Sequence, residues 1–154
     1  MSPKLPTPAQ QLEVFLAKYD PAVRAQARRA LAKMRRLLPG TLEIVYDNYN
    51  ALVIGFGPTD RASDAICSIA LYPRWVTLFF LYGADLTDPT RRLQGSGKQV
   101  RQVRLQDAAT LDDPEIRALL NQALHRAKSP VNPKQKRRLL IKSISPKQRP
   151  RRPF

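Results

Sequence analysis

Residues 69–105 decide the fold, and they read IALYPRWVTLFFLYGADLTDPTRRLQGSGKQVRQVRL. Apolar runs at residues 65–71 and 75–82 lie on either side of the tight connection Tyr72-Pro73-Arg74. A polar stretch and a glycine-containing loop then lead to an alternating basic run at residues 99–105. Runs of this length, rich in β-branched and aromatic residues and bounded by turn residues, predict three strands. The first two are joined too closely for a parallel crossover, so they should run antiparallel.

Two further strands are predicted upstream, at residues 41–46 and 51–56, around a turn at residues 47–50 that is rich in Asn and Asp. Two helices are predicted before these strands and one after them, so the order of elements is ααβββββα. This order predicts an α+β fold, in which two N-terminal helices and one C-terminal helix pack on a five-stranded, mainly antiparallel sheet.

Each helix begins with a proline in its first turn. Thr7 is the predicted N-cap of the first helix, and Gln10 occupies the capping-box position. Pro21 opens a second helix that stops at Pro39-Gly40, and Pro114 opens the third.

The net charge of +15 is concentrated toward the C-terminal end. From Arg126 onward the chain carries eleven of its 27 Lys and Arg residues and no Asp or Glu. Prolines punctuate this segment, and it has few apolar residues to offset its conformational entropy. We therefore expect a flexible lead-in at residues 1–7, one domain at residues 8–128, and a basic, proline-rich tail at residues 129–154 that is disordered without a partner.

Cysteine usage and hydropathy indicate the compartment. Cys67 is the sole cysteine, which excludes an intramolecular disulfide framework. Residues 1–11 lack the apolar segment of a secretory signal peptide. The longest apolar stretch, residues 75–84, is well short of the ~20 residues of a membrane-spanning helix. The sequence predicts a soluble cytoplasmic protein with no membrane span.

The central stretch and the last helix also carry a family resemblance. The residues that carry it are Tyr72-Pro73, the run 76–82, Gly83, Leu86, Pro89, Leu93-x-Gly95-x-Gly97-Lys98-x-x-Arg101-x-Val103-x-Leu105, Leu119, Leu120 and Ala123. Through them, residues 12–127 resemble the YdhG-like family, small bacterial domains of largely unknown function, and the resemblance implies a compact α+β domain with an antiparallel sheet. Some members are described as frataxin-like iron chaperones, an activity that needs oxygen ligands suited to iron; here the acidic residues are scattered.

The loop Gly95-Ser96-Gly97-Lys98 allows two interpretations. Clustered backbone N–H groups and a lysine suit an anion. The nucleotide-binding loop, however, needs four residues between its glycines and a helix after its lysine, so that type of site is excluded. The alternative is a glycine turn that starts the last strand. If the aromatic residues of the sheet line a pocket for a small anionic ligand instead of filling the core, we expect the pocket among Tyr46, Trp75, Lys98 and Arg101.

The tail is the second candidate site, for DNA or RNA. Its clustered cations suit non-specific attraction to phosphates. It has no aromatic residue apart from Phe154, so base readout is not expected. The alternatives are a solubilising tail and a segment that lies on anionic lipid. The candidate nucleic-acid-binding residues are Lys134, Lys136, Arg137, Arg138, Lys147, Arg149, Arg151 and Arg152.

No catalytic constellation is recognisable. Cys67 lies in an apolar strand and should be a buried small hydrophobe, and His125 suits the C-terminal end of a helix. We expect no catalytic residue, no metal and no cofactor. The sequence favours a non-enzymatic YdhG-like binding domain whose basic tail binds nucleic acid without sequence preference. The alternative is a frataxin-like iron chaperone, or a protein that binds a small anionic ligand through the domain alone.

Overall fold

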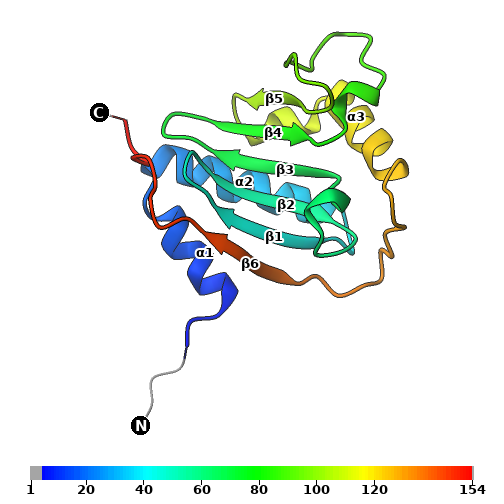
Figure 1. Ribbon diagram of the computed structural model, residues 1–154. Helices are drawn as coiled ribbons and strands as arrows, with labels where there is room; N and C mark the ends of the chain where they lie inside the picture. Colours follow the sequence, from blue (N-terminus) through cyan, green and yellow to red (C-terminus); the bar gives the residue numbers. More distant parts are fainter. Residues whose placement is uncertain (1–4, 154) are drawn as a thin grey trace.

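The computed structural model describes residues 5–153. Within them, three α-helices pack on a six-stranded mixed sheet (Figure 1). Short 3-10 helices join several of these elements. The elements in chain order are α1 (Pro8–Leu16), α2 (Pro21–Leu37), β1 (Leu42–Asp47), β2 (Leu52–Gly57), η1 (Ala62–Asp64), β3 (Cys67–Leu71), β4 (Val76–Phe80), η2 (Gly83–Asp85), β5 (Arg101–Leu105), η3 (Ala108–Asp112), α3 (Pro114–His125) and β6 (Leu139–Ile144).

The helix starts follow the predicted signals. The Thr7 hydroxyl accepts from the Gln10 backbone N–H at 3.1 Å, and the Gln10 side chain accepts from the Thr7 N–H at 2.9 Å, which confirms the capping box. Pro21 and Pro114 are the first residues of α2 and α3, where the missing N–H has no intrahelical partner to lose. Gly40 follows α2 with a φ of +84°, a conformation that favours glycine.

The first five strands form an antiparallel meander, as predicted. The order across the sheet is β5-β4-β3-β2-β1-β6, and β5 lies at one edge. The α+β class is therefore confirmed, with three helices on one sheet.

The predicted number of strands is wrong, because the C-terminal segment adds a sixth. Strand β6 pairs parallel to β1, from Glu43 opposite Leu139 to Asp47 opposite Ile144. The expectation of disorder over residues 129–154 is thus not met at residues 139–144. A segment with few apolar residues is ordered here because β1 supplies its hydrogen-bond partners and the core covers Leu139 and Ile141. Figure 1 shows this strand running along the lower edge of the sheet, beside α1.

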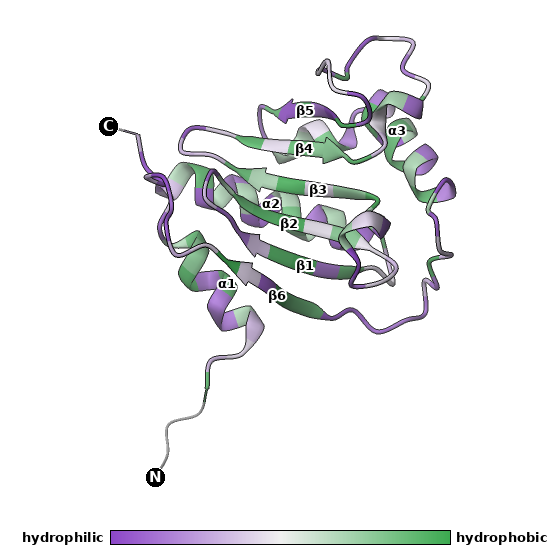
Figure 2. Cartoon of the chain, in the orientation of Figure 1, coloured by the Kyte–Doolittle hydropathy of each residue, from purple (hydrophilic) through white to green (hydrophobic). Residues whose placement is uncertain are grey.

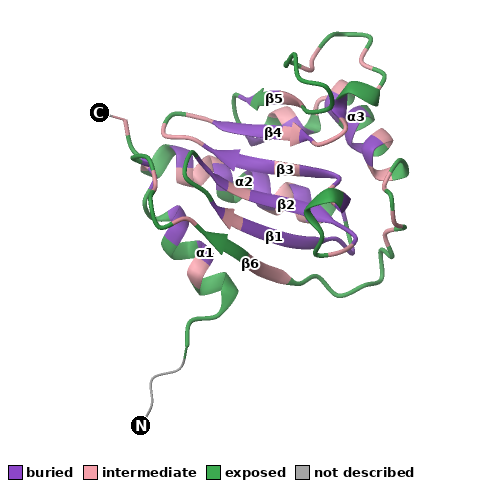
Figure 3. Ribbon diagram, in the orientation of Figure 1, coloured by how far each residue is buried: buried purple, intermediate pink, exposed green. Residues whose placement is uncertain are grey.

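One face of the sheet and the helices enclose the main core. Helix α2 lies behind the sheet in Figure 1 and contacts β3 and β4, and the strands between the two edges are buried along most of their length (Figure 3). The colouring by hydropathy in Figure 2 concentrates the apolar residues in these same strands, whereas the connection to β6 is hydrophilic. The core side chains of α2 are Val23, Ala27, Ala30, Leu31 and Met34, and those of the central strands include Leu52, Ile54, Phe56, Ile69, Leu71 and Leu78.

Candidate functional site

The four residues predicted to line one anion pocket do not come together. Trp75 lies just before the start of β4, whereas Arg101 pairs with Phe80 at the other end of that strand. The length of β4, roughly 13 Å, therefore separates them. Tyr46 lies on β1, three strands away from β4 across the sheet. The predicted pocket among these residues is wrong, because antiparallel pairing sends the two ends of the Trp75-to-Arg101 stretch to opposite ends of the sheet.

The Gly95–Lys98 loop is closed by its own arginine. The Arg101 guanidinium donates to the carbonyl oxygens of Gly97, at 2.6 Å, and of Val100, at 2.8 Å. Gly95 has a φ of +128°, and Lys98 is exposed. These contacts make Arg101 a clamp on the loop, which agrees with the interpretation of the glycines as a turn.

Trp75 belongs instead to an aromatic cluster at the turn between β3 and β4. Its ring lies 6.0 Å from that of Tyr72, and the Arg104 guanidinium stacks over it at 3.9 Å. Contacts of this kind attract the cation to the ring face. This end of the sheet is also where the last residues of the chain lie (Figure 1).

Arg151 fixes the end of the tail to the domain. Its side chain is 4% exposed, and it forms an ion pair of 2.9 Å with Asp47, whose side chain is 1% exposed. It also donates to the carbonyl oxygen of Asn48 and lies over the Tyr19 ring at 5.8 Å. A buried guanidinium of this kind cannot contact a nucleic acid, so the assignment of Arg151 to that surface is wrong.

Tyr19 completes this network from the helix side. Its hydroxyl donates to the carbonyl oxygen of Leu71 at 2.8 Å and accepts from the Leu52 backbone N–H at 3.1 Å. Burial raises the pKa of Tyr19 to about 12, although the nearby Arg151 charge acts in the opposite direction. The network thus joins the segment between α1 and α2, two strands and the tail.

A second buried carboxylate, Glu43, holds the start of β6. Arg35 on α2 binds it through two nitrogens, at 2.8 and 2.9 Å, and Arg137 lies 3.4 Å from it. The Glu43 backbone N–H donates to the Arg138 carbonyl oxygen at 2.8 Å. Besides Arg151, the tail cations Arg137 and Arg152 therefore have acidic partners; the partner of Arg152 is Asp20, at 3.6 Å.

The other predicted tail residues point to solvent. The exposed residues outside the two buried networks are Lys134, Lys136, Arg138, Lys147 and Arg149. The backbone N–H of Arg149 donates to the Tyr49 carbonyl oxygen at 2.9 Å, which ties the tail to the turn between β1 and β2 while the side chain remains exposed.

The docked tail creates a basic groove with the β3–β4 turn. The groove has a volume of about 570 Å³, and three arginines and Tyr72 lie along it. Tyr49, 52% exposed, lies on the neighbouring turn. We call this set the basic groove; its lining residues are Asn50, Tyr72, Pro73, Arg74, Arg149, Pro150, Arg152 and Pro153.

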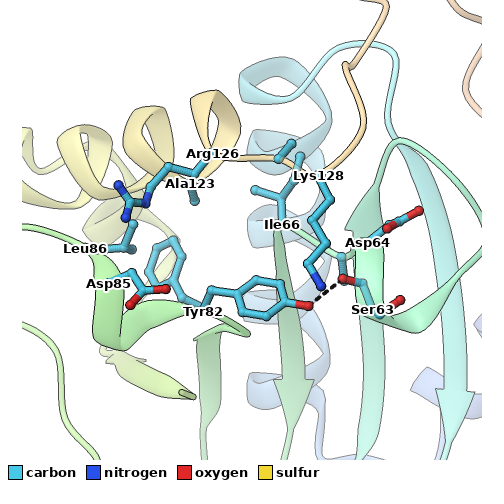
Figure 4. Close-up of a pocket in the computed structure, with 12 residues that line it drawn as sticks. Ser63, Asp64, Ile66, Tyr82, Asp85, Leu86, Ala123, Arg126 and Lys128 are labelled. Atoms are coloured by element: carbon cyan, nitrogen blue, oxygen red, sulfur yellow. Dashed lines mark hydrogen bonds between the residues drawn. The ribbon is translucent and has the colours of Figure 1, made fainter. Parts of the chain in front are cut away.

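A separate hollow of about 360 Å³ lies at the other end of β3 and β4, beneath the C-terminal end of α3 (Figure 4). Its floor is apolar, with Ile66 from the residue before β3, Phe80 from β4 and Ala123 from the helix. Arg126 and Lys128 extend from the end of α3 on two sides of the hollow. We call it the α3 pocket.

The face of the sheet opposite α2 carries a shallow apolar cavity of about 310 Å³. Tyr46, Val53 and Phe79 lie along it, and Val100 is 40% exposed beside it. The Tyr46 hydroxyl is buried and has no hydrogen-bond partner within the described residues. Burial, and to a smaller extent the charge of Asp60, raise the pKa of Tyr46.

The chain has one cysteine, Cys67, and one histidine, His125. Cys67 is buried, and burial raises the pKa of its thiol, which disfavours the thiolate. The His125 ring nitrogen Nδ1 lies 2.7 Å from the Asn121 carbonyl oxygen of the same helix. Within residues 5–153, no three His, Cys, Asp or Glu side chains form a group that could hold a metal ion. Over the same residues, no helix combines the length and apolar character needed to cross a bilayer.

Comparison with protein-family models, with curated proteins and with solved structures finds no match for this chain. The resemblance to the YdhG-like family therefore stays a prediction from the sequence.

Proposed function

We propose that the chain binds nucleic acid without sequence preference through the basic groove. The observation that carries the proposal is the convergence of Arg74, Arg149 and Arg152 on one groove beside Tyr72. Arg74 comes from the β3–β4 turn and the other two come from the tail, so segments distant in sequence supply one cationic surface.

The chemistry of the groove suits a phosphate backbone. Guanidinium groups bind phosphate oxygens through paired N–H donors and retain their charge at any physiological pH. Asp20 is the acidic residue nearest to Arg152, and at 3.6 Å in a largely exposed pair it competes weakly with a phosphate. Lys147 and, farther along the tail, Lys134, Lys136 and Arg138 add exposed positive charge that attracts the same polymer.

The aromatic residues favour a single strand over a duplex. Tyr72, Trp75 and Tyr49 lie at or next to the groove, and aromatic rings stack with unpaired bases irrespective of their identity. The tail itself has no aromatic residue apart from Phe154. In the folded chain, residues 149–153 of the tail lie beside Tyr72 of the sheet.

The docked position of the tail also lowers the entropic cost of binding. Arg151 and the backbone bond from Arg149 hold the tail arginines beside Arg74 before any ligand arrives. Groups that are ordered in advance lose less conformational freedom on association.

The test measures binding of fluorescent oligothymidine of about 20 nucleotides and of a duplex of equal length by anisotropy, between about 50 and 200 mM salt. The variant Arg74→Gln/Arg149→Gln/Arg152→Gln should lose at least about tenfold in affinity, and its slope of log affinity against log salt should fall by about 2, since each phosphate contact on a single strand contributes roughly 0.7.

The matched control removes the same charge elsewhere, with Arg29→Gln/Arg36→Gln/Lys98→Gln. These three cations lie on α2 and on the loop before β5, and none has an acidic partner among residues 5–153. The control variant should bind the oligonucleotide with an affinity within about threefold of that of the unchanged chain, since a lower net charge is its only effect. Equal losses in both triple variants, or no binding at the lower salt concentration, would contradict the groove.

No observation within residues 5–153 favours the iron-chaperone alternative, because no acidic cluster forms a ligand set there.

A further inference from the structure

The α3 pocket has the features of a small-molecule site that the nucleic-acid proposal does not use. Its volume of about 360 Å³ lies within the range of roughly 300–1,000 Å³ that is common for ligand pockets. A floor of apolar side chains under a rim with a few charged groups is the usual composition of such sites. The apolar lining consists of Ala65, Ile66, Phe80, Leu86, Ala123 and Ala127.

Lys128 is held in place over this floor. Its Nζ lies 4.7 Å from the centre of the Tyr82 ring, and the Tyr82 hydroxyl donates to the Ser63 carbonyl oxygen at 2.8 Å, which fixes the ring (Figure 4). The Tyr82 hydroxyl, and to a smaller extent the charge of Asp64, raise the pKa of the Lys128 ammonium, a group that is already charged at neutral pH. Among residues 5–153, no Asp or Glu lies within ion-pair distance of Lys128, so its ammonium is a positioned cation in the part of the chain that the structure describes.

Arg126 supplies the second cation. No Asp or Glu among residues 5–153 lies within ion-pair distance of its guanidinium. Figure 4 shows its side chain at the rim near Leu86, across the hollow from Lys128. Two cations over an apolar floor match a ligand with an apolar body and an anionic head.

The acidic residues of the rim limit the charge of that head. Asp64 accepts from the Thr59 hydroxyl at 2.5 Å, and its carboxylate is turned away from the hollow (Figure 4). Asp85 lies at the rim below Leu86, where it would repel a second negative charge. A singly charged carboxylate fits this balance better than a doubly charged phosphate.

We propose that the α3 pocket binds a small organic monocarboxylate, with its apolar body on Ile66, Phe80 and Ala123 and its carboxylate between Arg126 and Lys128. The size of the pocket suits a single ring or a short chain.

The experiment titrates phenylacetate into the ¹⁵N-labelled full chain and follows the amide resonances. Shifts should centre on Ser63, Tyr82 and Ala127. Phenethylamine, with a similar body and the opposite charge, and acetate, with the same head and no body, should each cause much smaller shifts at the same concentration.

The variants Arg126→Gln and Lys128→Gln should each weaken phenylacetate binding about tenfold, the effect of one lost hydrogen bond to a charged group. The control Arg29→Gln removes an exposed α2 cation and should leave the affinity unchanged. The proposal is overturned if phenethylamine binds as well as phenylacetate, if Arg29→Gln has the same effect as the pocket variants, or if no shift occurs near the pocket. Phenyl phosphate that binds more tightly than phenylacetate would overturn the assignment of a singly charged head.

Discussion

Glu43 and Asp47 place two carboxylates on the helix-facing side of β1, on either side of Val45. Each is 1% exposed, and each is paired with an arginine from the C-terminal segment. Removing a charged group from water is costly, and the cost is recovered only where the partner stays in place. Arg137 and Arg151 therefore contribute to the stability of the fold by pairing with these two carboxylates.

The first prediction concerns Arg151. The change Arg151→Gln should lower the free energy of unfolding by about 3 kcal/mol or more, because among residues 5–153 it leaves the buried Asp47 carboxylate with Lys18 alone, 3.5 Å away and partly exposed. Urea unfolding followed by Trp75 fluorescence measures the loss. Arg149→Gln, whose side chain is exposed, should change stability by less than about 0.5 kcal/mol. Equal stabilities of the two variants would show that the tail does not dock through Arg151.

The second prediction concerns alkaline pH and Tyr19. Its pKa is raised from 10.0 to about 12 in the folded chain, so between these values the folded state binds the phenolic proton more tightly than the unfolded state does. The stability that Tyr19 contributes is complete below pH 10 and declines as pH rises toward 12, by about 1.4 kcal/mol per unit of pH within that window.

The comparison with Tyr19→Phe isolates this effect, since the other tyrosines titrate in both chains. Below pH 10 the variant should be less stable, because the Leu52 N–H and the Leu71 carbonyl lose their shared partner. The difference should shrink by about 2 kcal/mol between pH 9 and 11.5 in urea unfolding experiments. A difference that stays constant with pH would mean that Tyr19 titrates normally.

At the scale of elements, the junction of β1 and β6 distinguishes this sheet from a simple meander. The neighbours β1 to β5 are joined in chain order, whereas β6 returns from the far side of α3 to pair with β1 in parallel. A register shift between Val45 and Tyr46 accompanies this pairing. β6 also contacts α1, so it connects the helix layer to the sheet edge.

The third prediction follows from this junction. A chain that ends at Lys128 should lose more stability than Arg151→Gln does, because the two buried carboxylates then lack Arg137 and Arg151 and the β1 edge is uncovered. It should also associate with increasing concentration, as measured by light scattering. A chain that ends at Pro146 keeps β6 and removes the Arg151 anchor, so its loss should resemble that of Arg151→Gln. If the chain ending at Lys128 is as stable as the full chain, β6 contributes nothing to the fold.

The elements that the sequence predicted are those with local signals. The capping box at Thr7, the prolines of α2 and α3, and the alternating runs of the meander all act within a few residues, so the sequence contains their cause. β6 has no such signal apart from Leu139, Leu140 and Ile141, and its order depends on a partner distant in the chain. The prediction of disorder was wrong at residues 139–144, because the composition of a segment does not indicate whether a distant strand supplies its hydrogen-bond partners.

The basic groove was harder to predict from the sequence than the fold, for a related reason. Trp75 and Arg101 belong to one stretch of sequence, yet antiparallel pairing places them at opposite ends of β4. Arg74 and Arg149 are far apart in sequence and share one groove. One signal was available: acidic residues at positions 43 and 47 of an otherwise apolar strand indicate that cations come to meet them, and a strongly basic tail is the natural source.

At the scale of the whole molecule, the two proposed sites occupy opposite ends of the sheet. The basic groove lies at the turn after β3, and the α3 pocket lies where β3 begins and β4 ends. The eleven Lys and Arg residues from Arg126 onward are therefore divided among ion pairs with buried carboxylates, the basic groove, the α3 pocket and exposed tail positions, and they do not form a single flexible arm. A positive field over one end of the molecule would speed encounter with a polyanion.

The pairing of β6 with β1 also matters while the chain is being made. β6 is synthesised about 95 residues after β1, which at about 5–20 residues per second leaves β1 unpaired on that side for roughly 5–20 s. An open strand edge invites pairing with other nascent chains, and inward-pointing charges are a known protection against it. We expect Glu43 and Asp47 to serve the growing chain in this way. Arg35 is synthesised before Glu43, but Arg137 and Arg151 emerge from the ribosome much later, and until then the two carboxylates keep water at the unpaired edge of β1.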